Sequence, residues 1–499
     1  LLDIRSIFND FFYSPYEFEP AQRKEFVQKK IDELKNLASF FTKTSKSKLI
    51  ISNLSVPYYS PYGIAEPNSE FGFHDVVLSF NNLLKDSVKN LDSVFLFDFS
   101  SFVTRFGEEN IFNFQNYFFG DIKIGLNYLP IFGESLMSYV IAYLGIAKKC
   151  LVLDLDNTLW GGIVGEDGFD GISLGPQPPG NVFYEFQRFL KGLTSRGILL
   201  AINSKNNFDD AIKVIREHPF MVLKENDFSC MVINWSDKAQ NIREIAKKLN
   251  IGLDSMVFFD DDPVNREYVR KELPQVTVPE LSTDPAENIR TLMTLNDFSL
   301  FEITDEDTKR NEMYLQQQQR IELEESSSNL EDFLKTLDIH VVVEKANGFT
   351  IPRISQLTLK TNQFNLTTKR YQKEDIEKFS QSDDFIIISV KVNDKFGDSG
   401  ITGVCIAKKE NQNIWSIDTF LLSCRIMGRE IEKVMLNYVI EEAKKNNVKI
   451  IRAKFIPTEK NSPIADFLPS CGFEKTDDFW ELDVEKSFKN PDFITVEET

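Results

Sequence analysis

The sequence predicts an α/β protein whose central domain is a parallel sheet with helices on both faces. Four short, continuously apolar runs have the length and composition of buried strands: residues 150–155, 197–203, 230–234 and 255–260. Segments with helical spacing of apolar residues separate these runs: residues 182–197, 207–218 and 237–250. Apolar strands that alternate with such helices are typical of a parallel sheet buried on both faces, and we expect this domain over residues 148–300.

Residues 1–147 are predicted to form a separate, partial α/β domain. It contains one amphipathic helix and two strands, expected at residues 20–41, 48–57 and 93–102. We find no catalytic motif in it. Ser52 and Asn53 follow the first strand as in a hydrolase loop, but an ordinary loop explains them better, and His74 has no recognisable partner.

The remaining chain is predicted to be a helical linker, residues 301–328, followed by an α+β domain, residues 329–485. Ser328 and Glu331 form a capping-box pattern at the next helix. The strands and the long helix of the last domain are expected at residues 340–345, 384–392, 403–409, 415–423 and 429–447. The polar tail from Lys486 is expected to be frayed.

Composition excludes several classes of function. The 499 residues carry a net charge of -19, which would repel nucleic acid and anionic membranes. No apolar run is long enough for a membrane span. The five cysteines are scattered and the histidines number only three, so we expect a reducing, cytoplasmic compartment, no disulfide framework and no zinc site.

Polar side chains follow all four strands of the central domain. The first strand leads to Asp154, Asp156 and Thr158, the second to Ser204, the third to Lys238, and the fourth to Asp260 and Asp261. Ligands of an open parallel sheet bind at the carboxyl ends of its strands, so these groups are expected to share one crevice.

Such a set suits phosphoryl transfer to a carboxylate. Asp154 would attack phosphorus, and Asp156 would protonate the leaving oxygen and later deprotonate the incoming nucleophile. Ser204 would donate a hydrogen bond to a phosphoryl oxygen, and Lys238 would offset the transition-state charge. Gly161 and Gly162 would let the chain turn tightly beside the pocket.

Carboxylates this close need a counter-charge, and the predicted one is Mg²⁺. Its ligands would be Asp154, the carbonyl of Asp156, and the pair Asp260 and Asp261. Taken singly, each feature has a plainer explanation: a surface turn, a loop hydroxyl or a solvated lysine at a helix start. All four, in order and each after a strand, favour the catalytic interpretation.

The arrangement resembles the haloacid dehalogenase (HAD) superfamily of phosphotransferases, type HAD-IIIC. Asp154, Asp156 and Thr158 match the family motif DxDxT. The Ser/Thr of the second motif falls on Ser204, the Lys of the third on Lys238, and the acidic fourth motif on Asp260 and Asp261. The resemblance implies a Rossmann-like core and an aspartyl-phosphate mechanism. The segment from Thr158 to Ser204 is too short for a large cap domain, which suits a bulky or macromolecular acceptor.

Within that superfamily the chain resembles the FkbH-like proteins. The strings "LDLDNTLWGGIVGEDG", "FFDDDPVNREYVR", "TNQFNLTTKRY" and "DTFLLSCRIMGR" carry this resemblance. It implies a reduced SGNH-like N-terminal domain and a GNAT-like acyltransferase domain at the C-terminus. It also implies dephosphorylation of 1,3-bisphosphoglycerate and transfer of the glyceryl group to the phosphopantetheine thiol of an acyl carrier protein, for polyketide-type biosynthesis.

The GNAT-like domain contains the residues that are predicted to bind the phosphopantetheine arm of the carrier protein, called arm-binding residues below. In "TFLLSCRIMGREIE", Arg425 and Gly428 match an RxxGxG/A loop that holds a pyrophosphate. Glu430 replaces a small residue and would repel phosphate, which favours a carrier-borne arm over coenzyme A. Asn362 and Gln363, in "TNQFNLTT", are expected to line a polar ligand cleft or to fix the domain, with Phe364 and Leu366 in the core.

Two cysteine positions bear on acyl transfer. Cys424 begins the same loop and is expected near a helix N-terminus. Its thiol, beside Arg425, is a candidate to hold the glyceryl group as a thioester. A buried structural cysteine is an equally good interpretation. Asn203, before Ser204, stands where cysteine is expected in many relatives, so an acyl-carrying thiol would be absent there.

The sequence therefore predicts a Mg²⁺-dependent phosphatase that acts on a small phosphorylated metabolite and loads a glyceryl group onto an acyl carrier protein. The alternative is a plain phosphomonoesterase fused to a coenzyme A-dependent N-acetyltransferase. A non-catalytic scaffold is a third possibility, which the intact set of Asp154, Asp156, Ser204, Lys238 and Asp260 argues against.

Overall fold

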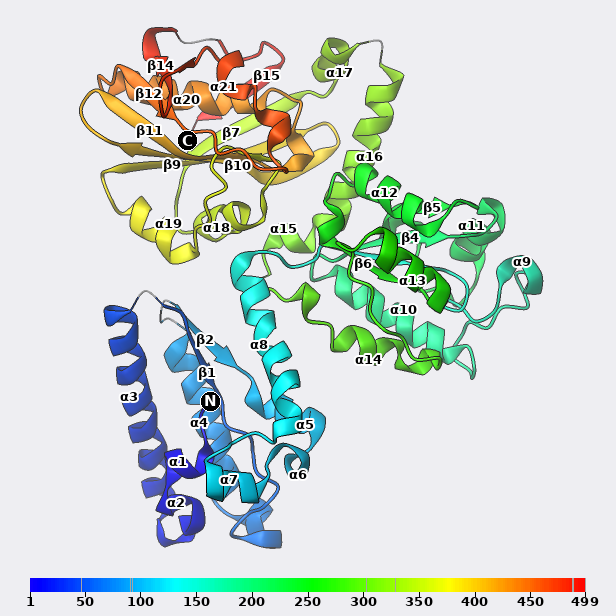
Figure 1. Ribbon diagram of the computed structural model, residues 1–499, viewed down its shortest axis with the longest axis vertical. Helices are drawn as coiled ribbons and strands as arrows, with labels where there is room; N and C mark the ends of the chain where they lie inside the picture. The colour runs from blue at the N-terminus through cyan, green and yellow to red at the C-terminus, as the bar shows by residue number, and fades with distance from the viewer. Residues whose placement is uncertain are drawn as a thin grey trace. The chain divides into compact units, whose positions relative to one another are not determined.

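The computed structural model, shown in Figure 1, describes residues 1–45, 47–89, 91, 93–301, 303–327, 329–486 and 489–498. The chain divides into two compact units, Leu1–Ser138 and Tyr139–Thr499. The finer domain boundaries expected from the sequence stay a prediction. Within the described residues, no helix has the length and apolar character that crossing a bilayer would require.

The first unit is helical around a two-stranded parallel sheet. Its main elements are α3 (Pro20–Thr44), β1 (Leu49–Ser52), α4 (Phe73–Val88) and β2 (Val94–Phe97). The sequence predicts α3, β1 and β2, whereas α4 was not predicted. Its core is rich in phenylalanine: Phe8, Phe11, Phe12, Phe73 and Phe80. Ser52 Oγ accepts the backbone N–H of Leu2 at 2.7 Å, and the Asn53 amide donates to Asp98 at 2.8 Å. Both side chains therefore fix loops.

The phosphate-chemistry motifs lie in the second unit, on a four-stranded parallel sheet with the order β5–β4–β3–β6. Its strands are β3 (Cys150–Leu153), β4 (Leu199–Ser204), β5 (Phe228–Ile233) and β6 (Met256–Phe259). The covering helices are α10 (Asn181–Thr194), α11 (Phe208–Glu217), α12 (Lys238–Lys248) and α13 (Pro263–Glu272). Side chains of α10 and α11 fill the core on one face, and those of α12 and α13 fill the core on the other.

The strand order places the predicted motifs at one point of this sheet. The chain runs outward from β3 to β4 and β5, and then returns to the other side of β3 as β6. A crevice opens at such a reversal, at the carboxyl ends of the two strands on either side of it, which are β3 and β6. Those ends lead here into Asp154 and Asp260, so the topology brings together carboxylates that are more than 100 residues apart.

The C-terminal part of the second unit is a larger mixed sheet with the order β13–β14–β12–β11–β10–β9–β7–β15, and β8 pairs with β11. Its strands are β7 (Ile339–Lys345), β8 (Phe364–Asn365), β9 (Phe385–Asp394), β10 (Gly397–Lys409), β11 (Ile414–Leu422), β12 (Ile450–Ala453), β13 (Glu474–Lys475), β14 (Trp480–Asp483) and β15 (Ile494–Glu498). Helix α20 (Ile431–Lys445) packs into one core and α18 (Ile351–Lys360) into another. The predicted α+β organisation is confirmed.

The short strand β8 occupies the space where β11 and β12 diverge. These two strands pair only over Ile414–Ile417 and Ile450–Ala453. Farther along, Leu421 and Leu422 of β11 pair with β8 instead, and the Ile456 N–H donates to the carbonyl of Leu366 at 2.8 Å. Phe364 and Leu366 are buried in the core, as the sequence predicts.

Two expectations about segment ends change. The frayed tail is wrong in part, because Ile494–Glu498 forms β15, parallel to β7, with Ile494 buried. The unpaired edge of β7 supplies hydrogen-bonding groups that the sequence of the tail does not reveal. Ser328 of the expected capping box lies outside the described residues. Helix α17 (Leu330–Thr336) is capped by Asn329, whose side chain accepts the Asp332 N–H at 2.9 Å.

The linker helix α16 (Arg310–Ser326) is held to the C-terminal sheet by a buried ion pair. The Arg320 guanidinium donates two hydrogen bonds of 2.7 Å to the carboxylate of Asp394, and Arg429 donates a third at 3.1 Å. The side chains of Arg320 and Asp394 are 2% and 0% exposed. A bidentate pair removed from water in this way fixes the helix on the sheet.

We predict that Arg320→Ala lowers the free energy of unfolding by about 3–5 kcal/mol, because removal of one partner leaves buried charge on Asp394 with weaker compensation. Urea unfolding followed by fluorescence measures the loss. The matched control is Lys335→Ala, which removes an exposed pair with Glu331 and should leave the midpoint unchanged. Equal midpoints for both variants would contradict the anchoring role.

Candidate active site

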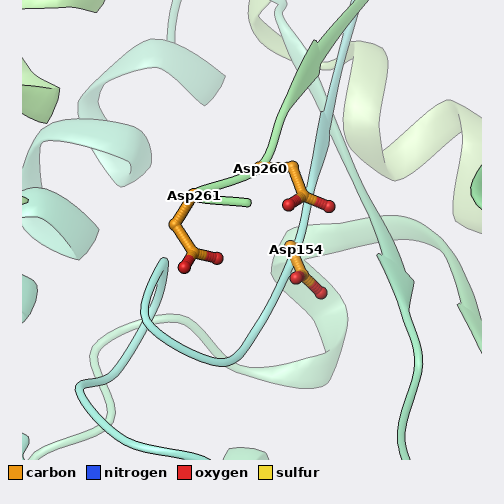
Figure 2. Close-up of side chains that lie close together, drawn as sticks. All are labelled: Asp154, Asp260 and Asp261. Carbon is orange, nitrogen blue, oxygen red and sulfur yellow. The ribbon is translucent and has the colours of Figure 1, made fainter. Parts of the chain in front are cut away.

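Three carboxylates gather at the carboxyl ends of β3 and β6 (Figure 2). Asp154 follows β3, and Asp260 and Asp261 follow β6. One oxygen from each lies within 4.8 Å of the others. Asp154 and Asp260 are buried, whereas Asp261 reaches solvent. The predicted set is therefore brought together, with one side open to the exterior.

Lys238, the first residue of α12, is the positive charge of this cluster. Its Nζ lies 2.8 Å from Asp154 Oδ1 and 3.0 Å from Asp260 Oδ2, and it donates to the carbonyl of Asn203 at 2.7 Å. Burial alone would lower the pKa of Lys238, but the charges of Asp154 and Asp260 raise it. The lysine therefore stays an ammonium group and holds the two carboxylates in place.

The charges of the cluster do not balance. Three carboxylates face one ammonium, which leaves two negative charges when all are ionised. Burial, and then the charge of Asp154, raises the pKa of Asp260. Partial burial, followed by the charges of Asp154 and Asp260, raises the pKa of Asp261 to about 7, although this residue reaches solvent. A divalent cation with oxygen ligands fits this excess in sign, size and donor type.

Asp156 is oriented by three hydrogen bonds. Its Oδ1 accepts the Trp160 indole N–H at 2.8 Å and the Val164 backbone N–H at 3.1 Å, and its Oδ2 accepts the Asn206 amide at 2.8 Å. Burial raises the pKa of Asp156, while these hydrogen bonds work in the opposite direction. A fixed carboxyl group with a raised pKa has the properties of a general acid and base.

Ser204 and Thr158 are both buried beside this group. The Ser204 hydroxyl accepts a hydrogen bond of 3.3 Å from Asn206 Nδ2, so one amide links it to Asp156. Among the described residues the Thr158 hydroxyl has no hydrogen-bond partner. The structure thus places all the predicted catalytic residues of the central sheet at one edge, with Ser204 free to donate its proton.

Two supporting residues were not predicted. Arg266 of α13 is buried and donates to the backbone carbonyls of Asp260 and Asp261 at 2.9 and 2.7 Å, which fixes the turn that holds both carboxylates. Asn206 orients Asp156, as described above. A polar residue two positions after Ser204 was a detectable signal, whereas nothing in the sequence ties Arg266 to a carbonyl.

The turn after Asp156 depends on glycine, as predicted. Gly162 has a φ of +94°, and a Cβ there would lie 2.5 Å from Asp167 Oδ2. A Cβ on Gly161 would lie 2.6 Å from the ring of Phe183. The chain can therefore turn here, and carry the Val164 N–H back to Asp156, only with glycine at both positions.

Asn203, which replaces an expected cysteine, has a structural role. Its amide donates to the carbonyl of Lys238 at 3.0 Å, and its Oδ1 accepts the amide of Asn241 at 3.0 Å. All three residues are buried. The network positions the start of α12 and hence the Lys238 ammonium.

The predicted arm-binding residues lie elsewhere. Asn362, Gln363, Cys424 and Arg425 line one cavity of about 330 Å³, which also contains Lys149. Lys149 precedes β3, so this cavity is at the opposite end of that strand from Asp154. Gly428 is not among the lining residues. The sequence-predicted residues therefore form two separate groups.

The expectation that Cys424 lies near a helix N-terminus is wrong. Helix α20 begins only at Ile431, and Cys424 belongs to a three-residue 3-10 turn, Cys424–Ile426. The residue before α20 is Glu430, in a left-handed conformation with a φ of +61° and with its carboxylate 2.6 Å from Lys433 Nζ.

Comparison with known proteins finds similar solved structures. No model of a protein family matches the sequence, and no curated protein matches it. The chain is 34% identical to the N-terminal part of the protein BF1531 from Bacteroides fragilis, which contains a phosphatase domain and was solved in complex with Mg. The similarity covers 57% of this chain and 74% of that one, with a TM-score of 0.53.

Weaker similarities are to acetyltransferases. The Escherichia coli ribosomal-protein-S18-alanine N-acetyltransferase is 9% identical over 30% of this chain and 97% of its own, with a TM-score of 0.24. The GNAT domain of S. lividans PAT is 12% identical over 28% of this chain and 89% of its own, also with a TM-score of 0.24. Similarities at this level carry no argument about cofactor or activity.

We predict that Mg²⁺ raises the melting temperature more at about pH 8 than at about pH 5. The pKa of Asp261, raised from 3.8 to about 7, means that the folded protein binds this proton more tightly than the unfolded chain. Its contribution to stability is present below about pH 4 and is lost as the pH rises through about 7. Above that pH the cation replaces the proton. Thermal unfolding with and without Mg²⁺ measures the difference, which Asp261→Asn should largely remove. A Mg²⁺ effect independent of pH in wild type would contradict the cation site.

Proposed function

The chain belongs to the HAD type of phosphatases, and we propose that it is a Mg²⁺-dependent phosphatase whose nucleophile is Asp154. One observation carries this proposal above the others. The carboxylate of Asp154 lies between a buried ammonium group, Lys238, and the acidic pair that follows β6. A carboxylate beside an ammonium group at the carboxyl end of a strand has the position that nucleophilic attack on a phosphate requires.

The residues present fit a magnesium ion. Asp154, Asp260 and Asp261 would hold it, and their uncompensated charge matches a divalent cation. When bound, the ion would supply positive charge that reduces repulsion between the carboxylate and the phosphate of the substrate. Arg266 would help to keep two of the ligands in place through their backbone carbonyls.

We propose the following chemical steps for these side chains. An oxygen of Asp154 forms a bond to phosphorus while the bond to the leaving oxygen breaks, and Asp156 donates its proton to that oxygen. Asp156 then removes a proton from the incoming nucleophile, which releases phosphate from Asp154. Lys238 and the Ser204 hydroxyl stabilise the charge that develops on the phosphoryl oxygens.

We further propose that the substrate is an activated glycerate, 1,3-bisphosphoglycerate, and that the glyceryl group passes to an acyl carrier protein, as in the FkbH-like proteins. Two phosphates must then leave by different routes. Asp154 takes the ester phosphate, and a thiol attacks the acyl carbonyl, so that the carbon–oxygen bond breaks and the second phosphate leaves. The short segment between Thr158 and Ser204, which leaves room for a large partner, supports this proposal.

The position of Cys424 defines its place in this scheme. Its cavity is at the other end of β3 from Asp154, so one bound substrate cannot contact both groups. Capture of the glyceryl group by Cys424 would require the dephosphorylated acyl phosphate to move. Direct attack by the thiol of the carrier arm at the phosphatase edge needs no such step, and we favour it.

We predict that Asp154→Asn lowers the rate of phosphate release by more than about 10³-fold, because the amide cannot attack phosphorus. Release from p-nitrophenyl phosphate with Mg²⁺ measures it. The control is Asp262→Asn, in the same acidic run. Asp262 caps α13 by accepting the Val264 N–H at 2.8 Å, a hydrogen bond that asparagine retains, so activity should remain within about twofold. Equal activity of the two variants would contradict the assigned nucleophile.

We predict a glyceryl mass increment on a phosphopantetheinylated carrier protein after incubation with the enzyme, Mg²⁺ and 1,3-bisphosphoglycerate. Intact-protein mass spectrometry measures it, and Asp154→Asn should abolish it, whereas Cys424→Ala should not. Phosphate release without an increment would favour a plain phosphomonoesterase. Loss of the increment in Cys424→Ala, with phosphate release unchanged, would restore Cys424 as an acyl carrier.

A further inference from the structure

We propose that the cavity between Lys149 and Arg425 binds a small phosphate monoester that carries a hydroxyl group. The cavity has a volume of about 330 Å³ and lies within the second unit. Lys149 and Arg310 line it together with residues of helix α18 and of the loops that follow α18, β11 and β12. The length of β3 separates this cavity from the carboxylate cluster. The cavity is therefore a second site, independent of the proposed phosphatase chemistry.

Five cationic side chains define the cavity: Lys149, Arg310, Arg353, Lys360 and Arg425. They are mostly removed from solvent, and the side chains of Arg353, Arg310 and Lys360 are 9%, 13% and 15% exposed. A protein with a net charge of -19 has no general need for such a cluster. Cations brought together out of water are costly unless an anion compensates them.

The protein supplies only part of that compensation. Asp307 contacts Arg310 and lies 3.6 Å from Lys360 Nζ, and Glu306 lies 4.0 Å from Arg353. Within the described residues, Lys149 and Arg425 have no carboxylate at ion-pair distance.

At the rim, Lys460 pairs with Asp254, and Glu459 is exposed to solvent. Six cations therefore face four carboxylates, counting Glu459, which is an excess of two positive charges when all of these groups are ionised. A phosphate monoester at neutral pH carries close to two negative charges.

The titration behaviour of the cations agrees with this excess. Burial, and then the charge of Arg310, lowers the pKa of Lys360 well below its ordinary value. Burial, and then the charge of Arg425, lowers the pKa of Arg353 to about 10. Burial lowers the pKa of Lys149 as well. In the unliganded protein these groups therefore repel one another, and a bound anion would relieve the repulsion.

A second observation specifies the organic part of the ligand. Gln363 Oε1 is buried in the cavity wall and accepts no hydrogen bond from the described residues. A buried acceptor without a donor costs free energy. A hydroxyl group attached near the phosphate would supply the donor, and the neighbouring residue Asn362 lines the same cavity. The cavity thus combines phosphate recognition with one hydroxyl-specific contact.

Calorimetric titration of the full chain with glycerol 3-phosphate tests the proposal. EDTA is included so that no cation joins the carboxylate cluster, which then repels the probe. We expect saturable binding that Lys360→Gln weakens at least about tenfold, as expected for loss of a charge-assisted hydrogen bond. Lys460→Gln is the matched control, because Lys460 lines the same cavity but is exposed and paired with Asp254, and it should change affinity less than about threefold.

Two further comparisons locate the site and the hydroxyl contact. Asp154→Asn should bind glycerol 3-phosphate as wild type does, since the cavity is separate from the catalytic edge. Ethyl phosphate, which lacks the hydroxyl groups, should bind to wild type more weakly than glycerol 3-phosphate does. The two probes should bind to Gln363→Met with equal affinity. Equal binding of both probes to wild type would overturn the hydroxyl contact.

Thermal unfolding keeps the test independent of any folding defect. In phosphate-free buffer Lys360→Gln should melt at a higher temperature than wild type, because one repelling cation is removed. Glycerol 3-phosphate should raise the melting temperature of wild type but not that of the variant. Absence of binding to wild type at millimolar concentrations, or equal affinity in wild type and Lys360→Gln, would overturn the proposal. Binding lost in Asp154→Asn would place the probe at the catalytic edge and overturn it as well.

Discussion

The contact of one buried ammonium group with two carboxylates is the interaction on which the candidate active site depends. Lys238 lies within 3.0 Å of both Asp154 and Asp260, which come from opposite sides of the strand reversal in the sheet. Without this charge, burial of the two carboxylates so close together would be strongly unfavourable. The surrounding structure serves to place it: the Asn203–Asn241 network fixes the start of α12, and Arg266 fixes the turn after β6.

Lys238 alone does not balance the charge of the site. When all three carboxylates are ionised, two negative charges remain, and Asp261 meets solvent at one side of the cluster. A cation and a phosphate can therefore enter from this side. Asp156 lies on the neighbouring turn, where hydrogen bonds orient both of its carboxylate oxygens. The opposite end of β3 has the reverse character, a cavity with excess positive charge. The second unit thus has a negatively charged cluster at one end of β3 and a positively charged cavity at the other.

Much of this could be predicted from the sequence, because the apolar strands of a parallel sheet and the polar residues at their carboxyl ends are short-range patterns. Apolar runs ending in Asp154, Ser204 and Asp260 predict both the sheet and the edge at which the groups meet. The roles assigned to these residues remain predictions. Contacts between distant segments leave no such signal in the sequence. Examples are the hydrogen bond from Arg266 to the carbonyl of Asp261, the pairing of β15 with β7, and the cavity that Lys149 and Arg425 both line. The prediction that Cys424 lies near a helix N-terminus is wrong for a local reason. Gly428 and Glu430 have positive φ values, so the helical conformation begins only after them, with α20.

The central claim is that phosphate passes through a covalent bond to Asp154. Rapid acid quench of the enzyme during turnover of a phosphate ester with Mg²⁺, followed by intact-protein and peptide mass spectrometry, tests it most directly. We predict a mass increment of one phosphoryl group on the peptide that contains Asp154, which disappears when the substrate is exhausted. Turnover at full rate with no increment on that peptide, or an increment on another residue, would contradict the claim.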